Sequence, residues 1–357
     1  MKVKSRFLIA ALCFVLSLAC CRKNESEQQF VGVTEFQFHY DAADREVTVD
    51  VWYPSKEQPG AKPHEFISGF SGKATLDALP DSEGAPYPLI VFSHGFQGTR
   101  FQSIFLVEAL ASAGYVVAAP DHPDSLVAEG GFKLSDATLY TQRPAEISFV
   151  IDKMTELNES DPILSGMIDL GHVGMTGHSL GGYTTLMVSG AQLDIPGIIE
   201  KCSTPPEPLG CFMANSFTPG AGVISGRDER VIASISLAPL SSVFTGDGIN
   251  KLGIPHTVMG GTKDSVTPFP SEQGEAYDNL NPPKYLLEIK QGGHMTFSDL
   301  ACRFMTNLVD CKDSDKKHKI ILDYEIPFFD LYLKGKASAG SNLKSKETED
   351  FKFSSSI

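Results

Sequence analysis

The stretch His172-Val-Gly-Met-Thr-Gly-His-Ser-Leu-Gly-Gly-Tyr183 decides how this chain is expected to fold. A short apolar run leads into the motif Gly177-x-Ser179-x-Gly181, and a helix-like run follows from Tyr183 to Val188. The pattern is typical of a nucleophile elbow, in which a strand ends, the chain turns sharply and a helix begins behind a serine. Small residues are needed around the serine because the turn brings backbone against backbone. The alternative is a glycine-rich turn with an incidental serine.

Strand and helix patterns alternate along the rest of the chain. Thr34–Tyr40 and Glu46–Tyr53 alternate apolar and polar residues, which predicts a leading antiparallel hairpin. A continuous apolar run predicts a strand buried on both faces over 87–92, and further strands are predicted over 115–120, 231–237, 256–259 and 285–289. Helical patterns cover 101–113, 144–157 (with Pro144 in its first turn) and 319–333. This order predicts an α/β domain with a mostly parallel sheet, whose sites lie beyond the carboxyl ends of the strands.

Composition suggests how the chain is divided. Residues 31–334 are predicted to form one catalytic domain, in which 54–86 is a surface excursion. The periodicity breaks down over 192–230, which we expect to be a lid-like insertion. The segment 335–357, with its Ser and Lys, is predicted to be a flexible tail.

Residues 1–19 have the features of a signal peptide. Three basic residues precede an apolar run, Phe7–Ala19, that is too short to span a bilayer. The run closes on Ser17-Leu-Ala-Cys20, which resembles a bacterial lipobox and makes Cys20 the predicted lipidation site. Cys21 is a weaker candidate, because Cys20 would then occupy the cleavage position. Residues 20–30 would form a tether, so we expect an exported protein of the bacterial cell envelope, lipid-anchored at the periplasmic face or the cell surface; secretion without an anchor is the alternative.

The charge of the chain limits its partners. The net charge is −14, and removal of a leader that carries Lys2, Lys4 and Arg6 would make the chain more acidic still. This balance argues against nucleic acid as a partner and against electrostatic docking on anionic lipid. Contact with a membrane would therefore depend on the lipid anchor, and the oligomeric state is left open.

Four cysteines remain outside the leader and lipobox. Cys202–Cys211 and Cys302–Cys311 each enclose eight residues, and an oxidising compartment favours disulfides over free thiols. We expect these two pairs among the three possible pairings, each contributing about 2–3 kcal/mol by loop closure. No CxxC or HxxxH spacing supports a metal site.

A serine nucleophile needs a base and an acid that orients the base. His294 follows the predicted strand 285–289 and is preceded by two glycines, and Asp264 follows the strand that begins at His256. Asp228 and Asp247 are rivals for the acid, but neither directly follows a strand. The order Ser179, Asp264, His294 is the one found in α/β-hydrolases.

Two backbone N–H groups are needed to bind an oxyanion. We expect them from Leu180, at the positive end of the helix dipole, and from Phe96, in the loop Ser93–Gly98. His94 and His178 flank this place and are expected to hydrogen-bond the two loops together. His122 either lines the pocket or hydrogen-bonds a turn.

Four segments of the chain carry a family resemblance: Val91–Phe96, Leu110–His122, Gly177–Gly182 and Gly292–His294. They resemble the platelet-activating-factor acetylhydrolase and dienelactone-hydrolase-like branch of the α/β-hydrolase superfamily, and bacterial polyester hydrolases are more distantly similar. The resemblance, over about residues 31–334, implies an α/β-hydrolase fold with helices on both faces of the sheet. It also implies carboxylester hydrolysis through an acyl-enzyme on Ser179, without metal or cofactor. True dienelactone hydrolases have a cysteine nucleophile, so Ser179 favours a serine carboxylesterase.

Two alternatives to a general serine carboxylesterase remain at this point. One keeps the site and changes the substrate to a phospholipid ester of the platelet-activating-factor type or to a polyester. The other is a binding lipoprotein on a hydrolase scaffold whose site is catalytically silent.

Overall fold

The computed structural model describes residues 30–123, 137–203, 205, 209–214, 216–217, 220–305 and 308–357. The signal peptide, Cys20 and nearly all of the predicted tether lie outside these residues. The strands of the central sheet are β1 (Phe30–Tyr40), β2 (Arg45–Ser55), β5 (Thr75–Leu76), β6 (Tyr87–Ser93), β7 (Val116–Pro120), β8 (Ile168–His178), β11 (Val231–Leu237), β12 (His256–Gly261), β13 (Lys284–Ile289), β14 (Lys346–Glu347) and β15 (Phe351–Ser356).

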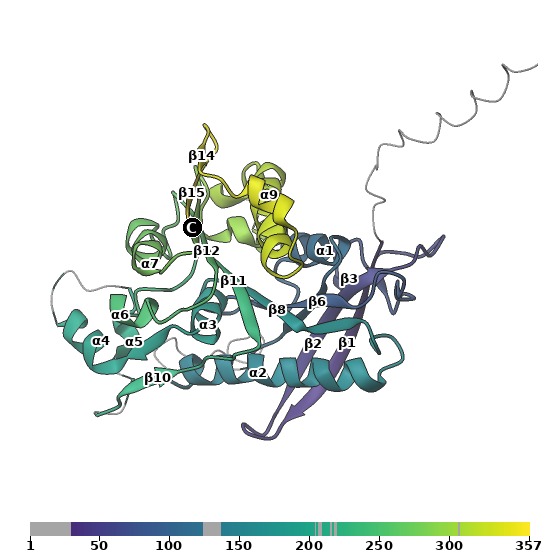
Figure 1. The fold of residues 1–357 in the computed structure, drawn as a ribbon, viewed down its shortest axis with the longest axis horizontal. Coiled ribbons are helices and arrows are strands. Elements are labelled where there is room, and N and C mark those ends of the chain that lie inside the picture. Colours follow the sequence, from purple (N-terminus) through teal and green to yellow (C-terminus); the bar gives the residue numbers. More distant parts are fainter. Residues whose placement is uncertain are drawn as a thin grey trace, which may run out of the picture.

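These strands form a sheet in the order β14-β15-β13-β12-β11-β8-β6-β7-β2-β1-β5 (Figure 1). The six central strands, from β13 to β7, pair in parallel. The hairpin β1–β2 joins one side of this core antiparallel through β7, and β15 joins the other side antiparallel through β13. The expected α/β-hydrolase fold with a leading hairpin is thus confirmed.

Helices cover both faces of the sheet. The longer ones are α1 (Ile104–Ser112), α2 (Ala137–Ser160), α3 (Leu180–Val188) and α9 (Ser314–Tyr332). Side chains of α1 and α9 pack with Phe92, Ile235 and Leu287 on one face, and α2 packs with Val91 and Met175 on the other. Figure 1 shows α1 and α9 above the central strands and α2 and α3 below them. Central strands buried on both faces explain the continuous apolar runs in their sequences.

Short elements connect or extend this framework. They are β3 (Glu65–Ile67), β4 (Phe70–Ser71), β9 (Gln192–Asp194), β10 (Val223–Ser225), α4 (Ile195–Cys202), α5 (Cys211–Ala214), α6 (Gly246–Ile249), α7 (Glu275–Asn279), α8 (Asp299–Phe304), the π-helix η3 (Pro270–Gly274) and the 3₁₀ helices η4 (His294–Phe297), η5 (Val309–Cys311) and η6 (Ala337–Asn342). Within the described residues, no helix is long and apolar enough to cross a membrane.

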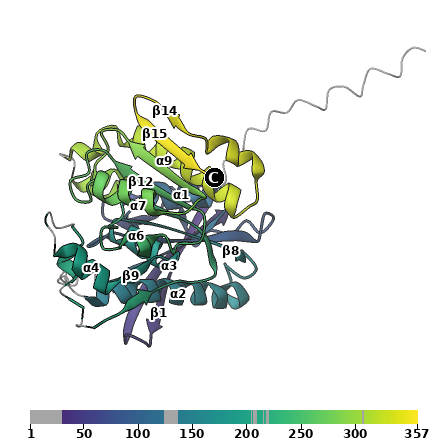
Figure 2. The same ribbon diagram turned by 60° about the vertical axis from the view of Figure 1, so that its left-hand side comes forward.

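The segment 192–230 leaves the central sheet, as expected for an insertion. Its strands β9 and β10 pair with each other in a separate small sheet, α4 lies beside β9 (Figure 2), and α5 contacts α4. Disulfides join Cys202 to Cys211 within this segment and Cys302 to Cys311 near the end of α8. Both predicted pairings are confirmed.

The prediction that Pro144 lies in the first turn of its helix is wrong. Helix α2 extends from Ala137 to Ser160 and has Pro144 in its interior. A proline there cannot donate to the carbonyl four residues earlier, which is that of Tyr140. The hydroxyl of Tyr183 in α3 donates to this carbonyl instead, at 2.9 Å. A tertiary contact thus replaces the missing helical hydrogen bond.

The prediction of a flexible tail over 335–357 is also wrong. Strand β15 pairs with β13 along its full length, from Phe351 opposite Ile289 to Ser356 opposite Lys284. The side chain of Phe353 is 1% exposed and stacks on Tyr324 and Tyr285, with ring centroids 4.1 and 5.9 Å away. Leu343 is also 1% exposed, and the ring centroid of Phe351 lies 5.4 Å from that of Tyr324. These apolar contacts and the backbone pairing hold a segment whose other residues are mostly polar.

Candidate active site

Ser179 lies between the carboxyl end of β8 and the first turn of α3, in a strained backbone conformation. Its φ is 58° and its ψ is −115°, a region that costs a non-glycine residue about 1–3 kcal/mol. The neighbouring strand β11 holds the turn in place, because the Ser179 N–H donates to the Leu237 carbonyl at 2.8 Å and the Leu240 N–H donates to the Ser179 carbonyl at 3.2 Å. The predicted elbow geometry is therefore present.

Two glycines of the motif are required by close backbone approach. A Cβ added at Gly181 would lie 1.9 Å from the carbonyl oxygen of Ser93, and one added at Gly177 would lie 2.4 Å from the carbonyl oxygen of Gly181. These distances are far below any van der Waals contact. The first turn of α3 can therefore pack against the end of β6 only without side chains at these positions.

The structure brings Ser179, His294 and Asp264 together in one hydrogen-bonded line. His294 Nε2 lies 2.9 Å from Ser179 Oγ, and His294 Nδ1 lies 2.8 Å from Asp264 Oδ2. The histidine and the aspartate are 4% and 6% exposed. An acceptor carboxylate on Nδ1 leaves Nε2 free to accept the serine proton, which is the arrangement that activates a hydroxyl nucleophile.

Asp264 is held as a carboxylate by four hydrogen bonds. Burial opposes its ionisation, but the hydrogen bonds from His294 and Thr267 keep the pKa of Asp264 below its usual value. Oδ1 accepts the N–H groups of Val266 and Thr267 at 2.8 Å each, and Oδ2 accepts the Thr267 hydroxyl at 2.9 Å. Sequence reasoning missed Thr267, although a threonine three residues after an aspartate is typical of a turn closed by the carboxylate.

The rival acids are engaged elsewhere. Asp228 accepts from Arg230 at 2.6 and 2.9 Å. Although burial opposes ionisation, these hydrogen bonds lower the pKa of Asp228 to about 2. Asp247 lies in the first turn of α6. Of the three carboxylates considered, Asp264 is the one hydrogen-bonded to His294.

Hydrogen bonds to Asp310 hold the loop that carries His294. Sequence reasoning also missed this residue. Asp310 Oδ2 accepts the Met295 N–H at 2.9 Å, and the Asp310 carbonyl lies 3.4 Å from the Thr296 hydroxyl. The disulfide between Cys302 and Cys311 closes the chain directly beside Asp310. The Cys302–Cys311 disulfide therefore lies next to the loop of His294, whereas the Cys202–Cys211 disulfide belongs to the insertion 192–230.

The loop Ser93–Gly98 lies beside the elbow. A Cβ added at Gly95 would be 3.3 Å from Ser179 Cβ. Arg143 donates to the carbonyl oxygens of His94 and Gly95, at 2.8 and 3.3 Å. Among the described residues, the N–H groups of Phe96 and Leu180 donate to no protein acceptor. An oxyanion hole requires N–H donors that have no protein acceptor, so the assignment of these two groups stays a prediction.

Two buried histidines near the elbow, His94 and His122, make hydrogen bonds within the protein. His94 Nδ1 lies 2.7 Å from the Gly95 carbonyl and its Nε2 accepts the His122 N–H at 2.9 Å. His122 contacts Ser93 Oγ at 2.9 Å and Glu146 Oε2 at 2.5 Å. Burial is the main reason why the pKa values of His94 and His122 are far below normal, and positive neighbours add to it. The geometry supports a structural role for both, as expected for His94.

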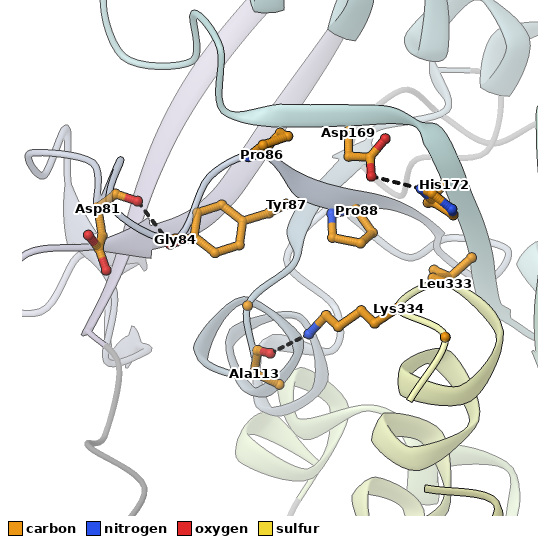
Figure 3. A pocket seen from close by; sticks show the side chains of 12 residues that line it. Asp81, Gly84, Pro86, Tyr87, Pro88, Ala113, Asp169, His172, Leu333 and Lys334 are labelled. Carbon is orange, nitrogen blue, oxygen red and sulfur yellow. Dashed lines mark hydrogen bonds and ion pairs between the residues drawn. The ribbon is translucent and has the colours of Figure 1, made fainter. Parts of the chain in front are cut away.

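A separate cavity of about 590 Å³ lies at the opposite edge of the sheet (Figure 3). Its walls include Tyr87 at the start of β6, Asp169 near the start of β8, and Lys334 after α9. Its charged groups are already engaged: Lys334 Nζ donates to the Ala113 carbonyl at 2.6 Å, and Asp169 pairs with His172 at 2.7 Å. Ser179, in contrast, lies at the carboxyl ends of the strands, which is the edge where ligands bind in sheets of this kind. This cavity is therefore separate from the candidate active site.

Within the part of the chain that the structure describes, no three His, Cys, Asp or Glu side chains converge in a way that could hold a metal ion. The side chains of Ser179, His294 and Asp264 are hydrogen-bonded to one another, as described above.

Comparison with known proteins supports the fold. The family model of platelet-activating factor acetylhydrolase, isoform II, matches residues 19–161. A platelet-activating factor acetylhydrolase from Cavia porcellus is 27% identical over an alignment of 198 residues, and the match covers 42% of this chain and 45% of that protein. The match thus spans less than half of either chain. A solved ferulic acid esterase from Streptomyces cinnamoneus has a TM-score of 0.59 with 22% identity, covering 87% of this chain and 92% of that one. The chain therefore has the α/β-hydrolase fold and resembles the platelet-activating factor acetylhydrolase branch of that superfamily.

Proposed function

We propose that the protein is a serine carboxylesterase that forms an acyl-enzyme on Ser179. The observation that carries the proposal is the continuous hydrogen-bonded line from Ser179 Oγ through His294 to Asp264, with heavy-atom distances of 2.9 and 2.8 Å. The strained elbow that presents Ser179 and the resemblance to acetylhydrolases support it.

The mechanism follows from these positions. His294 Nε2 takes the proton of Ser179 as Oγ attacks the ester carbonyl carbon, and Asp264 stabilises the imidazolium. The N–H groups of Phe96 and Leu180 donate to the oxyanion of the tetrahedral intermediate. The intermediate expels the alcohol, which takes the proton from His294, and leaves the acyl group on Ser179. Water then attacks the acyl-enzyme with the same proton transfers and releases the acid.

The direct test is turnover of p-nitrophenyl acetate and butyrate by Ser179→Ala. We expect kcat/KM to fall by at least about 10³-fold, because the nucleophile is lost. Ser189→Ala is the matched control: this buried serine lies at the other end of α3 and donates to Ser234 Oγ at 2.7 Å. The control should lose some stability and keep its activity. Full activity in Ser179→Ala would refute the proposal.

A second candidate keeps the site and changes the substrate to a phospholipid ester of the platelet-activating-factor type. The resemblance of the N-terminal part to acetylhydrolases favours it, and a polyester is the remaining variant. Rates with p-nitrophenyl esters of two to twelve carbons, an sn-2 acetyl phospholipid and a polyester film would separate these substrates. A preference for acyl chains of two to four carbons would exclude a long-chain lipase.

The remaining alternative is a binding lipoprotein without catalysis. A fluorophosphonate reacts only with an activated serine, so labelling of Ser179, detected by mass spectrometry, supports the enzyme. Absence of labelling in folded protein would favour the binding lipoprotein.

We also propose that the protein is exported and lipid-anchored through Cys20, and that the segment 192–230 acts as a lid. The two disulfides indicate an oxidising compartment outside the cytoplasm. Partly buried Phe96, Phe212 and Phe217 all pack against the same apolar cluster as α3, which joins the insertion to the neighbourhood of the elbow. Metabolic labelling with palmitate should mark the wild type and not Cys20→Ala; equal labelling of both would exclude Cys20.

A further inference from the structure

We propose that Gln102 is a positioning residue for ester hydrolysis, fixing the loop that carries the oxyanion donor to the loop that carries His294, with His178 as the link between them. The inference rests on the proposed function and assigns a role in it to a residue outside the triad. It follows from three consecutive hydrogen bonds that connect segments far apart in the sequence.

The three hydrogen bonds run through buried side chains. The Gly95 N–H donates to Gln102 Oε1 at 3.0 Å, and Gln102 Nε2 lies 2.9 Å from His178 Nδ1. His178 Nε2 lies 2.9 Å from the carbonyl oxygen of His294. Gln102 is 5% exposed and His178 is 2% exposed, so water does not compete for these bonds. They connect the residue before Phe96, the residue before Ser179, and His294 itself.

Donor and acceptor roles along this chain are determined at both ends. The His294 carbonyl can only accept, so His178 Nε2 carries the proton and neutral His178 accepts at Nδ1. The Gly95 N–H can only donate, so Gln102 faces it with Oε1 and faces His178 with its amide NH₂. If the Gln102 amide were flipped, its NH₂ would face the Gly95 N–H, which is also a donor, and its Oε1 would face His178 Nδ1, which is also an acceptor. A side chain with one acceptor and one donor is therefore required at position 102.

The neutral state of His178 is itself maintained by the surroundings. Burial, with a smaller contribution from the neighbouring His294, lowers the pKa of His178 to about 3, although the nearby Asp264 acts in the opposite direction. The rings of His178 and His294 are 4.7 Å apart. When His294 becomes an imidazolium during catalysis, a neutral His178 keeps donating to its carbonyl without adding a second positive charge.

These contacts fix the positions of two groups, the Phe96 N–H and His294 Nε2, that act in the same reaction step. The Phe96 N–H must meet the oxyanion while His294 Nε2 meets the serine proton. Loss of Gln102 would free the Gly95 N–H and leave His178 Nδ1 unpaired, so the two loops could shift independently. A misplacement of about 1 Å can cost about 100-fold in rate. The cost should appear in kcat and hardly in KM, because the affected contacts act on the transition state.

The first test is Gln102→Leu, which keeps the approximate volume and removes both hydrogen bonds. We expect kcat for p-nitrophenyl butyrate to fall by about 10- to 100-fold with KM within about twofold. Ser179→Ala and Ser189→Ala are assayed in parallel, with thermal unfolding of each variant. A kcat within twofold of wild type would overturn the inference while leaving the proposed function intact if Ser179→Ala is inactive. Activity in Ser179→Ala would overturn both, and an equal loss in Ser189→Ala would assign the effect to general destabilisation.

Gln102→Glu gives a second readout that a structural role alone would not change. The introduced carboxylate still accepts from Gly95, but it presents a second acceptor to His178 Nδ1, and only a bound proton can join two acceptors. The ratio of variant to wild-type kcat should therefore rise as pH falls from 8 to 6. A ratio that does not change with pH would overturn the inference, even if Gln102→Leu fails to fold.

Discussion

Glu325 offers a test of how the core beneath the elbow depends on pH. It lies in α9, is fully buried, and neither of its carboxyl oxygens makes a hydrogen bond of normal geometry within the described structure. Burial raises the pKa of Glu325 to about 8, and the hydroxyl of Thr176 opposes this rise only in part. Thr176 belongs to β8, three residues before Ser179. The folded protein therefore keeps a proton on Glu325 at neutral pH.

The sign of the pH dependence follows from proton linkage. In the unfolded chain a glutamate has a pKa near 4.3, so between about pH 4.3 and pH 8 the folded state holds one proton more than the unfolded state. The free energy of unfolding therefore falls as pH rises, by about 1.4 kcal/mol per pH unit for this group. Glu325→Gln removes the ionisable group and with it this loss. Between pH 5 and pH 7.5 the variant should gain about 3 kcal/mol relative to wild type.

Urea unfolding of both proteins, with disulfides intact, measures this gap at the two pH values. Subtracting the free energy of unfolding of the wild type from that of the variant cancels the contribution of other buried acids, such as Asp299, which titrate in both proteins. Glu347→Gln is the control: the hydrogen bond from Lys290 lowers the pKa of this exposed carboxylate, so its gap should not widen in favour of the variant. A gap between Glu325→Gln and wild type that is the same at pH 5 and 7.5 would refute the reasoning.

Two further predictions concern contacts described above. Removing the 302–311 disulfide (both cysteines to Ala) should lower kcat more than removing the 202–211 disulfide, because only the former lies next to the loop of His294. Esterase assays of the two variants at the same folded fraction test this. Equal losses of kcat would contradict a role of the 302–311 disulfide in holding that loop. Tyr183→Phe should destabilise the fold by about 1–3 kcal/mol, because it removes the hydrogen bond that the Tyr183 hydroxyl donates to the Tyr140 carbonyl. Adding Pro144→Ala should recover part of that loss in urea unfolding, since alanine supplies an N–H, and strict additivity of the two changes would argue against this compensation.

The parts of the fold that the sequence predicted are those where one physical constraint dominates. Strands β6 and β7 are buried on both faces, so their sequences are largely continuous apolar runs. The elbow is visible because the turn needs glycine at 177 and 181 and a serine between them. The positions of Asp264 and His294 follow from the same logic, because each comes directly after a parallel strand whose carboxyl end lies at the same edge of the sheet.

The parts that escaped prediction depend on contacts between distant segments. Gln102 sits among polar and apolar neighbours without any motif, and its place appears only when the loops of Gly95, His178 and His294 come together. Asp310 is similar, because it lies within the loop closed by the Cys302–Cys311 disulfide and accepts the N–H of Met295, which lies outside that loop. Strand β15 carries lysine and serine, and only Phe353 is buried deeply. An edge strand held mainly by backbone pairing leaves little trace in hydrophobic periodicity.

The arrangement of the site also indicates where specificity can vary. The backbone of Ser179 is held by Leu237, the carboxylate of Asp264 by Thr267 and the loop of His294 by Asp310, each through hydrogen bonds within the catalytic core. None of these supporting residues belongs to the segment 192–230. Changes in that segment are therefore expected to alter which acyl and alcohol groups are accepted while the reaction of Ser179 with a fluorophosphonate continues. The chemistry and the choice of ester would then reside in separate parts of one chain.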